Sequence, residues 1–359
     1  MNGTYLKHIS GMKGLGALIV LIHHFFYCYY PLFVPQGGSV SPIEHIPAAN
    51  LLVNGNFAVC LFILLSGYLV ARSAESYSEP GDYGFAIVKR YIRLMIPLAV
   101  ASILSYLLCV FHLYKIHAVS EVLSNDLTAN YFRVIRFYHL PLSVLYAPFG
   151  YSVLVGPFWM MKYILFGSFL ILGVTLIIRK LRYPFQIAVI VSVMLMFVFL
   201  DVYYACVLAG MLLFKGENRI RQWPAALRTM AALILLVVAF WLPATQKSVM
   251  DYDLYKNSLA AFLFVTAILI SDILVKCIGC RIMDALGRLS LGIYIFHWPV
   301  ICSLSCWMYL AWPIESTWMS LAVNFIVTVA VVLAMASGYN RWIEPRAVSL
   351  QKRIAGYFK

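Results

Sequence analysis

The sequence predicts an all-α fold, a single polytopic transmembrane domain (residues 1–359) of about ten spans with both termini in the cytoplasm. Three observations predict this class. The 359 residues are 63% hydrophobic and only 11% charged, with a mean hydropathy of +0.87. Long apolar runs recur from one end of the chain to the other, and basic residues concentrate between alternate runs. This composition excludes an ordinary soluble enzyme.

The apolar runs are long enough to be spans, because a bilayer core about 30 Å thick requires roughly 20 apolar residues per helix. No cleavage site follows the first run, so we expect it to be retained as the first helix. The fourth run is too long for one span, and we expect its first part, near 143–152, to be interfacial or re-entrant. Asp201 alone separates the fifth and sixth. The runs lie near 14–33, 51–71, 94–112, 145–178, 184–200, 202–214, 229–243, 259–275, 289–311 and 318–338.

The net charge of +13 is explained by membrane topology rather than by nucleic acid. With the N-terminus inside, most of the 27 Lys and Arg residues fall on cytoplasmic segments, as the positive-inside rule requires. Among the eight cysteines, only Cys277 and Cys280 form a C-x-x-C pair, and a lone pair is a weak metal signal. We therefore predict no nucleic-acid partner, no metal site and no bound cofactor.

The first apolar run carries ionisable groups at unusual depth. Lys13 and His24 share one helix face within about 20°, and His24 lies ~17 Å beyond Lys13, close to the bilayer midplane. His23 points elsewhere. An ionisable group at that depth is costly unless it faces a bundle interior or a wet cavity, which favours a function. The alternative is a neutral histidine that hydrogen-bonds across helices.

Two later groups extend this pattern. His297 lies ~13 Å beyond the basic boundary at Arg288, so two imidazoles at similar depth could share one cavity. The alternative is that "HWPV" (297–300) is part of a kinked helix in which His297 only packs against its neighbours. Lys162 lies inside the fourth run, where a charged amine requires a partner or water.

Several stretches, taken in order, resemble the motifs of acyltransferase family 3, a family of integral membrane proteins. Each motif is short and degenerate, and their joint order along nearly the whole chain carries the resemblance. The stretches are "ISGMKGLGALIVLIHHF" (9–25), "LFILLSGYLV" (61–70), "KRYIRLMIP" (89–97), "GPFWMMKYILFGSF" (156–169), "RLSLGIYIFHWPV" (288–300) and "RWIEPR" (341–346).

The resemblance implies transfer of an acyl group, commonly acetyl from acetyl-CoA, to a hydroxyl of a cell-surface polysaccharide, lipopolysaccharide or lipid-linked glycan. It also implies a multi-pass protein of the bacterial inner membrane. His24 stands at the family's catalytic histidine, and imidazole is the side chain best suited to take a hydroxyl proton near neutral pH. Lys13, Arg90 and Arg93 lie at the cytoplasmic boundary, where the phosphates of the acyl-CoA donor would arrive; the alternative is that they only set topology.

Four further residues are expected on the substrate side. We expect His297 and Tyr294 to line the acceptor side, and Trp159 and Lys162 to contact substrate from the Trp-containing stretch. The partners expected are therefore acyl-CoA, a glycan acceptor and the lipid bilayer.

Two departures from the family pattern affect these expectations. Lys13 replaces the usual Arg and lacks its planar fork, and Ile164 stands where many members carry a Glu. The rival class is a transporter or flippase, which would use the same intramembrane His and Lys. No inverted repeat is visible in the sequence, which disfavours that class.

Overall fold

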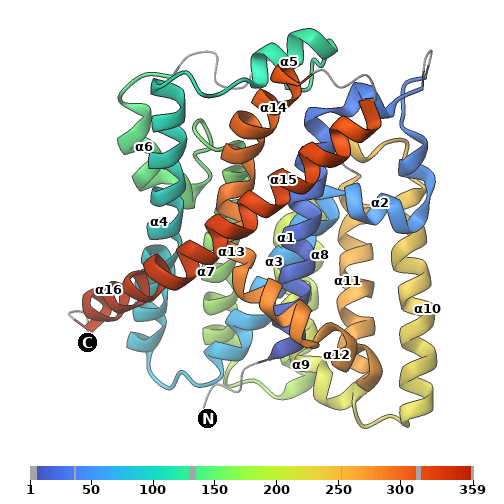
Figure 1. Cartoon of the computed structure of the whole chain (residues 1–359). Coiled ribbons are helices and arrows are strands. Elements are labelled where there is room, and N and C mark those ends of the chain that lie inside the picture. Colours follow the sequence, from blue (N-terminus) through green and yellow to red (C-terminus); the bar gives the residue numbers. More distant parts are fainter. Residues whose placement is uncertain (1–5, 36–37, 129–134, 252, 313–316, 357–359) are drawn as a thin grey trace.

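The computed structural model describes residues 6–35, 38–128, 135–251, 253–312 and 317–356, and within these ranges it is a bundle of α-helices without a β-strand (Figure 1). A π-helical turn, Ile301–Ser305, follows α13, and another, Tyr339–Ile343, follows α15. The helices are α1 (Lys7–Cys28), α2 (Pro47–Val53), α3 (Gly55–Ala74), α4 (Pro80–Val110), α5 (Ile116–Leu123), α6 (His139–Tyr146), α7 (Met161–Ile178), α8 (Tyr183–Leu200), α9 (Val202–Ile220), α10 (Ala225–Ala244), α11 (Leu254–Ile270), α12 (Asp272–Ile278), α13 (Arg281–Val300), α14 (Cys306–Ala311), α15 (Thr317–Gly338) and α16 (Glu344–Gly356).

The all-α polytopic class predicted from the sequence is confirmed. Within the described ranges, eight helical segments are long and apolar enough to cross a membrane, and the pair α11–α12, bent by 105°, makes up to nine. The remaining predicted span corresponds to α9, whose last turns carry Lys215, Glu217 and Arg219. These charges explain why hydropathy alone does not mark α9 as a span.

The fourth apolar run divides into an irregular segment and a helix. Two 3-10 turns, Ala147–Phe149 and Gly156–Met160, precede α7. Leu154 is fully buried, and the Tyr294 hydroxyl donates to the Pro157 carbonyl over 2.5 Å. These residues therefore pack into the bundle as turns, and Gly156–Ile178 forms one candidate span. The interfacial or re-entrant placement of residues near 143–152 stays a prediction. Irregular backbone at such depth requires partners within the protein.

Helix α1 forms the axis of the bundle. Figure 1 shows α1 near the centre beside α3 and α13, with α4 and α10 at opposite edges. The close approach of α1 to its neighbours depends on glycines, which have no side chain. A Cβ on Gly11 would lie 1.9 Å from the Ile278 carbonyl oxygen, and one on Gly287 would lie 2.1 Å from the Ser10 carbonyl oxygen. Backbone contact of this kind is how membrane helices pack tightly. It fixes α13 against α1.

The basic connections gather at one end of the bundle. The start of α1, the α3–α4 and α9–α10 connections and helix α12 all lie at the lower end in Figure 1. This is the end that we predict to face the cytoplasm.

Candidate active site

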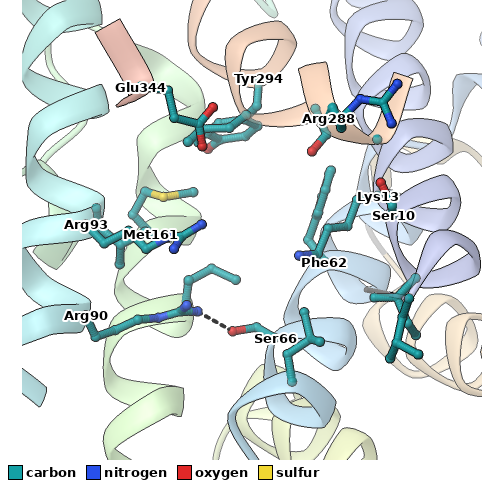
Figure 2. A pocket seen from close by; sticks show the side chains of 18 of the residues that line it. Ser10, Lys13, Phe62, Ser66, Arg90, Arg93, Met161, Arg288, Tyr294 and Glu344 are labelled. Carbon is teal, nitrogen blue, oxygen red and sulfur yellow. Dashed lines mark hydrogen bonds between the residues drawn. The ribbon is translucent and has the colours of Figure 1, made fainter. Parts of the chain in front are cut away.

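A cavity of about 620 Å³ opens between α1, α3, α4 and α13, close to the start of α16 (Figure 2). Its walls combine apolar side chains with a group of cations. The lining residues are Leu6, Ile9, Ser10, Lys13, Phe62, Ser66, Leu69, Arg72, Arg90, Arg93, Leu94, Met160, Met161, Ile164, Gly287, Arg288, Ser290, Leu291, Tyr294, Asn340 and Glu344.

The cavity is strongly basic. Five cations line it, namely Lys13, Arg72, Arg90, Arg93 and Arg288, against the single carboxylate of Glu344 among the described lining residues. Figure 2 shows the two α4 arginines reaching in from one side and the α1 lysine from the other. Because apolar walls strengthen electrostatic interactions, this cavity is suited to a multiply charged anion.

Several of these cations have N–H groups that form no hydrogen bond with the described residues. Arg90 donates to Ser66 Oγ over 2.6 Å, yet its buried Nε has no partner in the described part of the chain. Arg288 pairs with Asp284 on its own helix. Lys13 and Arg93 form no hydrogen bond or ion pair with any described residue. An incoming phosphate would meet unpaired donors, which bind phosphate by charge-assisted hydrogen bonds.

The two predicted imidazoles lie together, but outside this cavity. The ring centroids of His24 and His297 are 4.8 Å apart, and the His24 ring meets the Trp298 ring edge-on at 5.1 Å. His24 Nδ1 lies 2.9 Å from the Val20 carbonyl oxygen, and His297 Nδ1 lies 2.7 Å from that of Tyr294. A carbonyl can only accept, so each Nδ1 carries the proton and each Nε2 carries a lone pair. Both rings are thus in the form that a general base needs.

Tyr294 separates the cavity from the imidazoles. It lines the cavity, and its ring centroid lies 5.8 Å from that of His297. The rings of Phe62 and Phe158 lie 6.4 Å and 6.3 Å from it. Tyr294, Phe62 and Phe158, with the bond from the Tyr294 hydroxyl to Pro157, form an aromatic group on the side of the cavity nearest His297, which we call the aromatic floor.

Trp159 and Lys162 do not reach the cavity. Trp159 packs against Tyr163 and Tyr203, and the Lys162 ammonium lies 4.8 Å from the centre of the Tyr163 ring. Ile164 does line the cavity, so the position where many family members carry a Glu is apolar here. Of the four residues expected on the substrate side, Tyr294 and His297 lie with His24, whereas Trp159 and Lys162 face another part of the bundle.

The sequence analysis does not assign Arg72, Arg288 or Glu344 to the site, although all three line the cavity. Arg288 served only as a topology marker, and Glu344 lay unused within the "RWIEPR" stretch, which was the one signal that could have found it. No group of three His, Cys, Asp or Glu side chains that could hold a metal ion occurs in the described residues.

Comparison with known proteins identifies the family of the chain. The family model of acyltransferase family 3, described as an acyltransferase domain, matches residues 6–337. No curated protein and no solved structure matches the chain. The matched region contains every helix from α1 to α14 and nearly all of α15. The chain therefore belongs to acyltransferase family 3: it is an integral, multi-pass membrane enzyme that transfers acyl groups other than amino-acyl groups.

Proposed function

We propose that this protein is an O-acyltransferase that moves an acyl group, most simply acetyl, from acyl-CoA to a hydroxyl of a cell-surface polysaccharide, lipopolysaccharide or lipid-linked glycan. The bacterial inner membrane is the proposed location. The observation that carries the proposal is the basic cavity, in which Lys13, Arg90 and Arg93 converge with donors unpaired.

The acyl-CoA donor fits this cavity by its negative charge and by the length of its flexible arm. Coenzyme A carries phosphates on a long flexible arm that ends in the thioester. With the phosphates at Lys13, the thioester must travel ~17 Å along α1 to reach His24, and Tyr294 must move aside to let it pass. A transporter or flippase has no comparable support, because the family to which the chain belongs is one of acyltransferases.

The chemistry assigns His24 the role of general base. A sugar hydroxyl is a weak nucleophile, and transfer of its proton to His24 Nε2 allows the oxygen to attack the thioester carbonyl carbon. Collapse of the tetrahedral intermediate breaks the carbon–sulfur bond, and the CoA thiolate takes the proton from His24. One acyl group has moved, and the imidazole is neutral again. The ring of His297 lies 4.8 Å from that of His24 and 5.8 Å from that of Tyr294, which supports assigning His297 and Tyr294 to the acceptor side.

The test is mass spectrometry of surface glycans from cells that make the wild-type protein, His24→Ala or no protein, at matched membrane levels. We expect one additional acyl mass on the glycan with the wild type and none with His24→Ala. The matched control is His45→Ala, which removes an exposed imidazole from the loop before α2 and should preserve the modification. Identical glycans in wild-type and empty cells, or full acylation by His24→Ala, would contradict the proposal.

A further inference from the structure

His297 is a buried imidazole with an unused acceptor. Its side chain is 0% exposed, and its Nδ1 donates to the carbonyl oxygens of Tyr294 at 2.7 Å and Ile293 at 3.2 Å. Its Nε2 is buried and has no hydrogen-bond partner among the residues that the structure describes. A buried acceptor left unsatisfied lowers stability, so its retention calls for an explanation.

A structural role does not provide that explanation. His23 shows what a structural imidazole does here: its Nδ1 bonds to the Val53 carbonyl over 2.7 Å and so joins α1 to α2. The hydrogen bonds of His297 stay within α13 and join nothing to it. A leucine would fill the same space without burying an unsatisfied nitrogen.

The neighbouring His24 ring is placed to supply the missing donor. The two ring centroids are 4.8 Å apart, and rings joined by an N–H···N hydrogen bond have centroids about 5 Å apart. While both rings are neutral, both Nε2 atoms are acceptors and cannot bond to each other. Once His24 takes a proton, its Nε2–H becomes a donor, and a small ring rotation brings it to the His297 nitrogen.

Among the described residues, no carboxylate forms a hydrogen bond or ion pair with either imidazole. The side-chain hydrogen bonds of His24 and His297 go to backbone carbonyl oxygens. A protonated imidazole in an apolar bundle is costly unless a partner stabilises it. His297 is the neighbouring side chain that can accept a hydrogen bond from protonated His24.

We propose that His297 is the positioning partner of His24, a neutral imidazole that accepts a hydrogen bond from the protonated His24 ring during acyl transfer. This inference rests on the proposed function. The hydroxyl O–H bond breaks as its oxygen bonds to the thioester carbon, and the proton passes to His24 Nε2. His297 Nε2 accepts a hydrogen bond from that N–H until the carbon–sulfur bond breaks. The thiolate then takes the proton, and both imidazoles are neutral again.

The experiment compares acyl transfer by wild type, His24→Ala, His297→Leu and His297→Gln in membrane vesicles from an acceptor-containing host, with radiolabelled acetyl-CoA as the probe. The readouts are kcat and KM for acetyl-CoA and CoA binding by the purified full-length protein. Ile293→Val, a change at a fully buried α13 position, is the packing control. We expect His297→Leu to lower kcat about tenfold to a hundredfold at unchanged KM, and His297→Gln, which keeps an acceptor, to restore part of the loss.

The outcomes separate this inference from the function on which it rests. If His24→Ala abolishes transfer while His297→Leu keeps the wild-type kcat, the role of His297 is wrong and the proposed function stands. If His297→Gln is no better than His297→Leu, or CoA binding falls together with kcat, His297 is only a packing residue. Full transfer by His24→Ala, or unlabelled glycan with the wild type, overturns the proposed function and this inference with it.

Discussion

Arg90 on α4 donates a 2.6 Å hydrogen bond to Ser66 on α3, across the wall of the basic cavity (Figure 2). The bond fixes one edge of the guanidinium, while its buried Nε remains without a described partner. The side chain is thus oriented before a ligand arrives. Preorganisation of this kind reduces the entropy lost when a phosphate binds.

Arg90→Gln should weaken donor binding without changing the chemical step. Loss of one charge-assisted contact with phosphate, worth about 1.5–3 kcal/mol, corresponds to a KM for acetyl-CoA about tenfold to a hundredfold higher at similar kcat. Steady-state kinetics at varied acetyl-CoA measures this. Arg179→Gln, at an exposed position after α7, is the control and should leave KM unchanged. A lower kcat at constant KM would place Arg90 in the reaction step instead.

Gly11→Ala should destabilise the bundle. The new Cβ would lie 1.9 Å from the Ile278 carbonyl oxygen, so the start of α1 must move away from α12, at a cost of about 1–3 kcal/mol. The measurement is the midpoint of thermal unfolding in detergent. Gly173→Ala is the matched control, because a Cβ there meets nothing within 4 Å. Equal midpoints for the two variants would show that α1 is not packed as described.

His23→Leu should separate stability from catalysis. The change removes the 2.7 Å bond to Val53 and leaves that carbonyl without its partner, which costs about 1–3 kcal/mol. We expect a lower thermal midpoint and an unchanged kcat per folded molecule, in contrast to His24→Ala. Transfer assays normalised to folded protein test this, and loss of kcat in His23→Leu would mean that the two adjacent histidines act together.

Glu44→Ala should loosen the loops at the other end of the bundle. The buried Glu44 carboxylate accepts from the Tyr30 hydroxyl at 2.9 Å, the Ser248 hydroxyl at 2.7 Å and the Val249 amide at 2.6 Å. The Tyr30 hydroxyl is protonated near neutral pH and so acts as the donor, and burial raises its pKa further. We expect a loss of about 1–3 kcal/mol, read as faster proteolysis of these loops. Glu121→Ala, on the exposed face of α5, should digest at the wild-type rate.

Hydropathy located the spans because bilayer thickness imposes one length on every helix. Hydropathy does not distinguish a buried apolar segment of irregular backbone from a helical span. The residues from Ala147 to Met160 belong to the fourth apolar run, and only their tertiary partners, such as Tyr294, show that they pack into the bundle as turns. Composition does not encode those partners.

The site was predictable as far as local spacing reaches. Arg90 and Arg93 lie one turn apart, so their convergence follows from helix geometry. Arg72 and Glu344 join them only because the tertiary fold brings α3 and α16 to the same cavity as α4, which no spacing reveals. Lys162 follows the cavity-lining Met161 by one residue, and the resulting turn of about 100° on α7 directs its side chain elsewhere.

The aromatic floor at Tyr294 has a consequence for the permeability of the membrane. A basic cavity that continued through the bundle as an open path would conduct small anions down the membrane potential. Tyr294 lines the cavity on the side nearest His297, with the rings of Phe62 and Phe158 beside it. We therefore expect these aromatic side chains to keep the basic cavity from becoming such a path, so that the protein does not dissipate the ion gradients that the membrane maintains.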